Sequence, residues 1–148
     1  MEVPDRVSAI LKQKGGEVWS IARESTVYDA LVLMANKEIG ALLVMDGGHI
    51  AGVMSERDYA RKIILKARSS KETRVEEIMM SPPITISGDC SISEAMRIMT
   101  EHRIRHLPVV DSAAAVLGMI SIGDLVKWII TSQEETIEQL HSYIAGRT

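Results

Sequence analysis

The sequence predicts an α+β fold built from two similar halves, because the chain repeats itself. Residues 25–46 match residues 90–111 at an offset of 65, with six of 22 positions identical and five others exchanging one apolar residue for another. The match resumes at an offset of 66, where residues 52–58 fall on 118–124. A duplication of this kind constrains the predicted fold more strongly than any local pattern does. One such half would struggle to bury both faces of a small sheet, so we expect the two halves to pack sheet against sheet.

Each repeat is predicted to follow a βαββα order. In the first repeat, Thr26 followed by Asp29 has the spacing of a helix start, and apolar residues then recur at helical spacing. We expect a strand over 17–21, a helix from Thr26 to about Gly40, strands over 41–45 and 50–54 around the turn 46–49, and a helix from Ser55 to about Lys66. In the second repeat, we expect a strand over 84–87, a helix from Ser91, strands over 107–110 and 116–120, and a helix over 124–130.

The remaining segments read as flanking helices and a linker. Residues 68–74 are polar, and Pro82-Pro83 would stop the short helix predicted over 75–80. The run Ser132-Gln133-Glu134-Glu135 has a capping-box pattern, and Ile137, Leu140 and Ile144 follow on one face. The predicted organisation is an N-terminal helix in 1–16, the first repeat in 17–67, a linker with a short helix in 68–82, the second repeat in 83–131 and a C-terminal helix in 132–148.

Composition excludes several classes of function. The net charge is −3 and only five residues are aromatic, with no Phe, which argues against general binding of nucleic acid or of an anionic membrane. No apolar run reaches membrane-spanning length, and the N-terminus lacks a signal-peptide core. Cys90 is the single cysteine and cannot form an internal disulfide. We therefore expect a cytoplasmic protein with a core of Ile, Leu, Val, Met and Ala.

The duplicated order of motifs resembles a known family. A strand and the pattern Gly-apolar-apolar-Ser-x-x-Asp lead into a helix at Gly52 and again at Gly118. This order resembles the cystathionine-β-synthase-type (CBS) domain, which in tandem forms a Bateman module, over roughly residues 18–130. The stretches SERDYARKIILKARSSKETRVEEIM, MTEHRIRHLPVVD and LGMISIGDLVKWII are similar to small stand-alone CBS-pair proteins. The resemblance implies a pseudo-two-fold axis between repeats, and a homodimer in which two modules form a flat disc.

The resemblance also implies a ligand. CBS pairs bind AMP, ADP, ATP, S-adenosylmethionine or, in some stand-alone members, NAD in the cleft between repeats. The resemblance assigns ribose binding to the Asp of Ser-x-x-Asp, here Asp58 and Asp124. A carboxylate suits this role because it can accept hydrogen bonds from both ribose hydroxyls. Ser55 and Ser121 would then sit at the mouth of a helix, where backbone N–H groups favour phosphate. The competing interpretation is a capping box, which has the same spacing.

Other residues would complete the nucleotide site. The candidates for the apolar walls around adenine are Ile104, Leu107 and Pro108, and main-chain groups around Ile84 and Thr85, or near Ser20, could read the edge of the ring. Arg105 and His106 would supply cations for phosphate, although most arginines are simply solvated. The matching residues of the first repeat, Gly40 and Ala41, carry no charge, and Arg57 compensates only in part. The two sites should therefore differ.

Alternative chemistries find less support. His102 and His106 are four residues apart, but the companion Glu of a helical metal pair is missing and Pro108 ends the helix. Cys90 has no resolving cysteine, and no hydrolase or dinucleotide-binding glycine motif is present. We predict a non-catalytic sensor that binds an adenine nucleotide and signals to a separate, unidentified effector protein. The alternative is an interaction adaptor whose nucleotide clefts are empty or vestigial.

Overall fold

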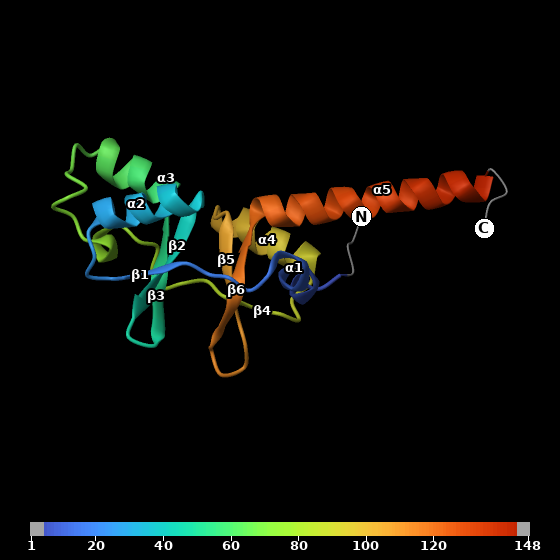
Figure 1. Cartoon of the computed structure of the whole chain (residues 1–148), viewed down its shortest axis with the longest axis horizontal. Coiled ribbons are helices and arrows are strands. Elements are labelled where there is room, and N and C mark those ends of the chain that lie inside the picture. Colours follow the sequence, from blue (N-terminus) through green and yellow to red (C-terminus); the bar gives the residue numbers. More distant parts are fainter. Residues whose placement is uncertain (1–4, 145–148) are drawn as a thin grey trace. The chain divides into compact units, whose positions relative to one another are not determined.

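The structure repeats the same plan twice. We describe the chain from a computed structural model that covers residues 5–144. Residues 17–84 form one compact unit, the repeat-1 unit, and residues 5–16 together with 85–144 form a second, the repeat-2 unit. Each unit holds one three-stranded sheet and its helices. In Figure 1 the repeat-1 unit runs from blue to yellow-green, and the repeat-2 unit is yellow to red with its N-terminal helix in dark blue. The predicted α+β class with two βαββα repeats is therefore confirmed.

The repeat-1 unit contains a mixed sheet in the order β1-β2-β3, with β1 parallel and β3 antiparallel to β2. Its elements are β1 (Ser20–Ala22), α2 (Val27–Lys37), β2 (Ala41–Asp46), β3 (His49–Ser55), α3 (Glu56–Tyr59), the π-helical turn η1 (Ala60–Ile64) and the 3-10 turn η2 (Val75–Glu77). Helix α2 ends before the predicted Gly40, because Glu38 adopts the left-handed conformation with φ of 54° and closes the helix. The last predicted helix of the repeat changes to a π-helical turn after Tyr59.

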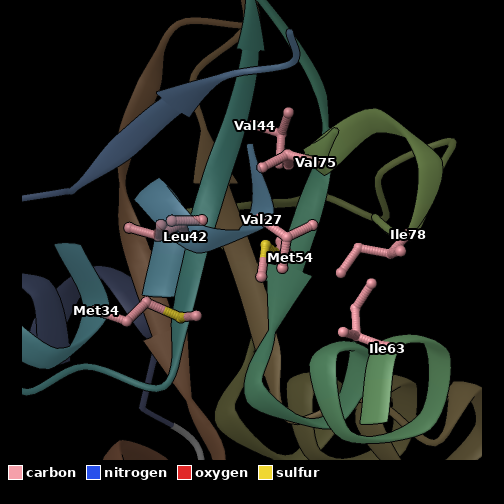
Figure 2. Close-up of a cluster of buried hydrophobic side chains, with 9 residues drawn as sticks. Val27, Met34, Leu42, Val44, Met54, Ile63, Val75 and Ile78 are labelled. Atoms are coloured by element: carbon pink, nitrogen blue, oxygen red, sulfur yellow. The ribbon is translucent and has the colours of Figure 1, made fainter. Parts of the chain in front are cut away.

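An aliphatic core holds the repeat-1 unit together. Figure 2 shows Leu42 and Val44 on β2, with Ile63 and Ile78 pointing toward each other from separate segments. The cluster consists of Val27, Ala30, Met34, Leu42, Val44, Met54, Ile63, Val75 and Ile78, all of them buried. Contiguous burial of this kind supplies most of the driving force for folding. The prediction of a core of Ile, Leu, Val, Met and Ala therefore holds for the buried cluster of this unit, and the partly buried Trp19 and Tyr59 pack against it.

The segment predicted as a linker is part of that core. Val75 and Ile78 are fully buried, and the Thr73 side chain is 2% exposed, with its hydroxyl donating to the Ser69 carbonyl at 2.7 Å. The Val27 N–H donates to the Thr73 carbonyl at 2.8 Å, which ties the segment to the start of α2. The predicted short helix over 75–80 is limited to η2. Polar composition alone could not show this, because the buried residues are interspersed among charged ones.

The repeat-2 unit has the matching sheet, in the order β4-β5-β6, and takes in the N-terminal helix. Its elements are α1 (Val7–Lys14), β4 (Ile86–Ser87), α4 (Ile92–His102), β5 (His106–Val110), β6 (Val116–Ser121) and α5 (Ile122–Ile144). Helix α1 packs against β6 and α5. Its backbone joins the unit as well, since the Val7 N–H donates to the Cys90 carbonyl at 2.9 Å. The predicted flanking helix is thus a structural component of the second repeat.

The duplication extends to backbone details. Thr26 and Ser91 occupy equivalent positions, and each hydroxyl accepts the backbone N–H three residues later at 3.1 Å. Glu38 and Arg103 are also equivalent, and both close their helices in the left-handed conformation. The change of offset from 65 to 66 falls in the second hairpin, where the Asp111 carboxylate accepts the N–H groups of Ala113 and Ala115. The extra residue therefore lengthens a turn and leaves the strands in register.

The C-terminal helix differs from prediction. We expected a helix over 124–130 and a separate one from Ser132, but α5 is continuous over 23 residues. No Pro interrupts this stretch, and its one Gly, Gly123, lies in the first turn. The Ser132 carbonyl accepts the Thr136 hydroxyl at 3.0 Å, a bond between helical residues four apart, so Ser132 lies inside the helix rather than capping it. Residues 145–148 of the predicted C-terminal segment lie outside the described residues.

Candidate functional site

The Ser-x-x-Asp motif of the first repeat forms a capping box where β3 passes into α3. The Asp58 backbone N–H donates to the Ser55 hydroxyl at 3.2 Å, and the Ser55 backbone N–H donates to Asp58 Oδ2 at 2.9 Å. The Glu56 N–H donates to the Gly40 carbonyl at 3.0 Å. Two of the first backbone donors of α3 are therefore satisfied within the unit. The Asp58 side chain remains 18% exposed.

The second repeat builds the same arrangement. The Asp124 N–H donates to the Ser121 hydroxyl at 3.1 Å, and the Ser121 N–H donates to Asp124 Oδ2 at 2.9 Å. The Ile122 N–H donates to the Arg105 carbonyl at 2.8 Å, which matches the Glu56 bond at the equivalent positions. The capping interpretation is thus correct in both repeats. Capping is compatible with ligand binding by Asp124, since this side chain is 24% exposed and can accept further hydrogen bonds.

Each motif carboxylate also faces a lysine that sequence reasoning missed. Lys62 Nζ lies 3.3 Å from Asp58 Oδ1, one helical turn along the chain, a spacing that could have predicted the pair. The position equivalent to Lys62 in the second repeat is Trp128. There Lys14 supplies the cation from α1, with Nζ 2.7 Å from Asp124 Oδ2 and 2.9 Å from the Met119 carbonyl. No local pattern could have indicated a partner 110 residues away.

Electrostatics keep Asp124 ionised. Burial raises the pKa of Asp124, but hydrogen bonds from Lys14 and from the Ser121 backbone, together with the Lys14 charge, outweigh burial and lower it below the ordinary value. The carboxylate is therefore an anion and an acceptor at neutral pH. The bonds from Lys14 and from the Ser121 backbone both fall on Oδ2, so the group has acceptor capacity for a hydroxyl-bearing ligand.

His106 lies next to this carboxylate at the start of β5, where it pairs in register with Ser121 on β6. Burial lowers the pKa of His106, the positive charge of Lys14 lowers it further, and Arg105 adds to this, while Asp124 acts in the opposite direction. The net direction is downward, which favours a neutral imidazole at neutral pH. A neutral imidazole can donate one hydrogen bond and accept another, but it supplies no positive charge for phosphate. Arg105 is exposed and remains available for that role.

The lowered pKa of His106 predicts a loss of stability in mild acid. Between about pH 6.5 and the folded-state value, the unfolded chain binds more protons at this position than the folded chain does. Stability should be complete above about pH 7 and fall as pH decreases through this range, by no more than about 1.4 kcal/mol per pH unit for one proton. Urea unfolding between about pH 5.5 and 7.5 would show a flatter dependence in His106→Asn than in the exposed control His49→Asn. An unchanged slope in His106→Asn would refute the assignment.

The remaining predicted site residues lie in several environments. Arg57 follows Ser55 in α3 and is half-buried, with interactions of its own. Ile104 is half-buried in the loop before β5, whereas Leu107 and Pro108 are buried within that strand. Ile84 and Thr85 are the last residue of one unit and the first of the next. The structure thus places Ser121, Asp124, Arg105 and His106 together, at the edge where β5 and β6 meet α5.

Other kinds of site lack support among residues 5–144. His102 is the last residue of α4 and His106 opens β5, so the two do not share a helix. No group of three or more His, Cys, Asp or Glu side chains that could hold a metal ion occurs in this range. Within the same range, no helix is both long enough and apolar enough to cross a membrane. The pKa of Cys90 is raised, mainly by burial, which disfavours a reactive thiolate.

The fold and the duplicated motif define a class of protein, one that carries two tandem copies of a small α+β domain. The CBS domain model matches the chain twice, over residues 12–65 and 75–131. The chain therefore belongs to the CBS domain family and carries two copies of the domain. This confirms the resemblance inferred from the sequence.

Individual relatives support the same assignment. The CBS domain-containing protein CBSX3, mitochondrial, from Arabidopsis thaliana is 39% identical over 149 residues, covering 95% of this chain and 72% of the relative. YhcV from Bacillus subtilis is 30% identical over 109 residues, covering 74% and 76%. Among solved structures, a provisionally named signal-transduction protein with CBS domains from Burkholderia ambifaria MC40-6 is 52% identical with a TM-score of 0.83, covering 87% of this chain and 96% of that one.

Proposed function

We propose that this CBS pair is a non-catalytic sensor that binds an adenine nucleotide through Asp124 and, more weakly, through Asp58. The observation that carries the proposal is the pair of partly exposed carboxylates at equivalent positions, each held in one orientation by its capping box. A fixed carboxylate can accept hydrogen bonds from both ribose hydroxyls, and bonds to a charged acceptor are stronger than neutral ones. Structural capping alone does not require an anion with exposed oxygen surface.

The surroundings of Asp124 favour a phosphorylated ligand. Lys14, Arg105 and His106 lie around the carboxylate, and two of them carry positive charge at neutral pH. The matching residues of the first repeat, Gly40 and Ala41, carry no charge, and the cations identified near Asp58 are Lys62 and Arg57. The two repeats should therefore bind nucleotides with different affinity. AMP, ADP, ATP and NAD all share the adenosine that the motif would recognise.

The signal would pass to a separate protein. A ligand that binds only the folded, ordered form of the site raises the population of that form by mass action. In this proposal the response acts through a surface of the pair that contacts an effector protein. We propose a reducing compartment such as the cytoplasm, because the sequence has a single cysteine and so forms no internal disulfide.

A thermal-shift panel tests the proposal directly. Purified protein would be melted with AMP, ADP, ATP, NAD, NADH and S-adenosylmethionine at matched concentrations. A ligand at about 100 times its Kd stabilises by about 2.7 kcal/mol, which corresponds to a shift of several degrees. We expect at least one adenine ligand to produce such a shift. A denatured sample would first be checked by mass spectrometry for nucleotide carried through purification.

Variants at Asp124 give the decisive comparison. Asp124→Asn keeps an acceptor for the capping bond but removes the charge, and we expect ligand affinity to fall at least about tenfold. Asp58→Asn should weaken binding less, because the residue that matches the exposed Arg105 beside Asp124 is the uncharged Gly40 in the first repeat. The exposed residue Asp89 provides the matched control, Asp89→Asn. If no ligand shifts ligand-free wild-type protein, or if Asp124→Asn binds like wild type, the adaptor alternative is favoured and protein partners become the targets to identify.

A further inference from the structure

The two motif carboxylates differ in which of their oxygen atoms are already engaged. At Asp58, Oδ2 accepts the Ser55 backbone N–H at 2.9 Å and the Ser55 hydroxyl at 3.0 Å, while Lys62 Nζ lies 3.3 Å from Oδ1. At Asp124, the backbone capping bond and the bond from Lys14 both fall on Oδ2. The first carboxylate therefore has a cation on the oxygen that its capping box leaves unused, whereas the bonds to the second leave Oδ1 to a ligand.

The core of the repeat-1 unit fixes Lys62 in this place. Lys62 Nζ donates to the Ile78 carbonyl at 2.8 Å, and Ile78 is fully buried. The next residue along η1, Ile63, is 2% exposed and points toward Ile78 in Figure 2. Because Ile63 anchors the π-helical turn and Ile78 supplies the carbonyl, the ammonium group is held on the Asp58 carboxylate.

The second repeat has a different residue at the position of this lysine. The equivalent residue is Trp128, and its indole Nε1 donates to Asp5 Oδ2 at 2.8 Å. The cation at Asp124 comes from α1 instead, and it shares the oxygen that already accepts the capping bond. The two carboxylates are thus equivalent in sequence and in capping, but they differ in the oxygen atom that the lysine contacts.

We propose that Lys62 competes with the ligand for Asp58, so that the chain fills its Asp124 site first and holds the repeat-1 site in reserve. Binding of both ribose hydroxyls requires acceptor capacity on the carboxylate, and an ammonium group held on Oδ1 takes up part of it. A ligand at Asp58 would have to displace Lys62 from its ion pair and from the Ile78 carbonyl. A ribose on Asp124 Oδ1 would leave Lys14 in place. The inference rests on the proposed function and adds the residue that ranks its two sites.

Two other roles of Lys62 predict different results. If Lys62 bound the phosphate of a nucleotide, its removal would weaken binding of AMP and leave binding of adenosine unchanged. If the ion pair with Asp58 served stability alone, its removal would change neither, because exposed pairs of this spacing contribute little. Competition alone predicts that adenosine, which carries the ribose hydroxyls without phosphate, binds more tightly once the lysine is removed. The contact of Lys62 with the oxygen outside the capping box favours competition.

Isothermal titration calorimetry with adenosine and with AMP tests the competition. The parent protein carries Asp124→Asn, which weakens the repeat-2 site so that the repeat-1 site is measured. Lys62→Met removes the charge and keeps the aliphatic length of the side chain, and Lys62→Ala is a second variant that removes the contact entirely. We expect each to bind adenosine at least about tenfold more tightly than the parent does. The control Lys66→Met removes an exposed lysine from the turn after η1 and should leave the affinity within about twofold.

The outcomes separate this inference from the proposed function. Adenosine affinity that is unchanged or reduced in both Lys62 variants would overturn the inference, while binding of adenine ligands to wild-type protein would still support the site at Asp124. Weaker binding of AMP with unchanged binding of adenosine would overturn it in favour of a phosphate contact. A gain in adenosine affinity that persists after addition of Asp58→Asn would also overturn it, because the gain must come through that carboxylate. If no adenine ligand of the thermal-shift panel binds wild-type protein or any variant, the proposed function is refuted and the inference with it.

Discussion

Leu42→Ala is expected to destabilise the chain by about 3 kcal/mol, because the substitution opens a cavity in the centre of the repeat-1 core. Leu42 is fully buried on the central strand of the repeat-1 sheet and belongs to the cluster in Figure 2. Truncation of the side chain to a methyl group also loses the transfer free energy of the carbon atoms that are removed. The surrounding strands are fixed by backbone pairing on both sides, so the cavity can collapse only in part.

Urea unfolding followed by fluorescence measures the loss of unfolding free energy in the repeat-1 unit, where Leu42 lies. Trp19 lies in the repeat-1 unit and Trp128 in the repeat-2 unit, so a Trp128→Phe background reports the repeat-1 unit by fluorescence. The matched control is Leu65→Ala, in which the same truncation is made at a side chain that is 75% exposed. At a concentration low enough to keep the chain monomeric, we expect a change within about 0.5 kcal/mol for this control. Equal effects of the two substitutions would refute the assignment of Leu42 to the core.

Gly52→Ala is expected to cost about 2–3 kcal/mol, because a methyl group has no space at this position. A Cβ atom added there would lie 2.5 Å from the Met80 carbonyl oxygen and 2.9 Å from the Met79 sulfur. That carbonyl accepts the Val53 N–H at 3.1 Å, so relief of the clash would pull apart a backbone bridge. On its other side, Gly52 is paired with Val44 of β2, and β3 cannot move away freely.

The equivalent glycine of the second repeat provides the comparison. A Cβ atom at Gly118 would lie 2.6 Å from Leu11 Cδ2, the end of a flexible side chain that can change its rotamer. We expect Gly118→Ala to cost about 1 kcal/mol, and Gly48→Ala, with nothing within 4 Å, to be neutral. Thermal or urea unfolding of the three glycine variants ranks them by their loss of stability. A Gly118→Ala protein destabilised as much as Gly52→Ala would contradict the distinction between backbone and side-chain neighbours.

The two repeats also differ in detail at the candidate site. The two Ser-x-x-Asp motifs cap their helices in the same way, but their cations come from different places. Asp58 receives Lys62 from the turn that continues its own helix, whereas Asp124 receives Lys14 from α1. Because the position of Lys62 is occupied by Trp128 in the second repeat, the site there requires α1. This is the structural reason for expecting two nucleotide affinities rather than one.

The sequence by itself determined the order of the elements, the helix starts and the capping motifs, which depend on neighbours along the chain. The duplication predicted the two βαββα repeats, and Thr26 and Ser91 marked the helix starts that the structure confirms. The capping boxes at Ser55 and Ser121 were predicted as one of two interpretations. The helix starts and capping boxes involve residues within about four positions of one another, so residue type and spacing are sufficient to specify them.

Only the tertiary structure decided what depends on distant segments. Local patterns gave no indication that α1 joins the second repeat, that Lys14 pairs with Asp124, or that Val75 and Ile78 complete the core of the repeat-1 unit. The capping pattern at Ser132 was wrong as a helix boundary, because the preceding residues are already helical and continue through it. Such outcomes are set by the free energy of burying apolar surface and pairing charges across the fold, and that free energy depends on which segments meet.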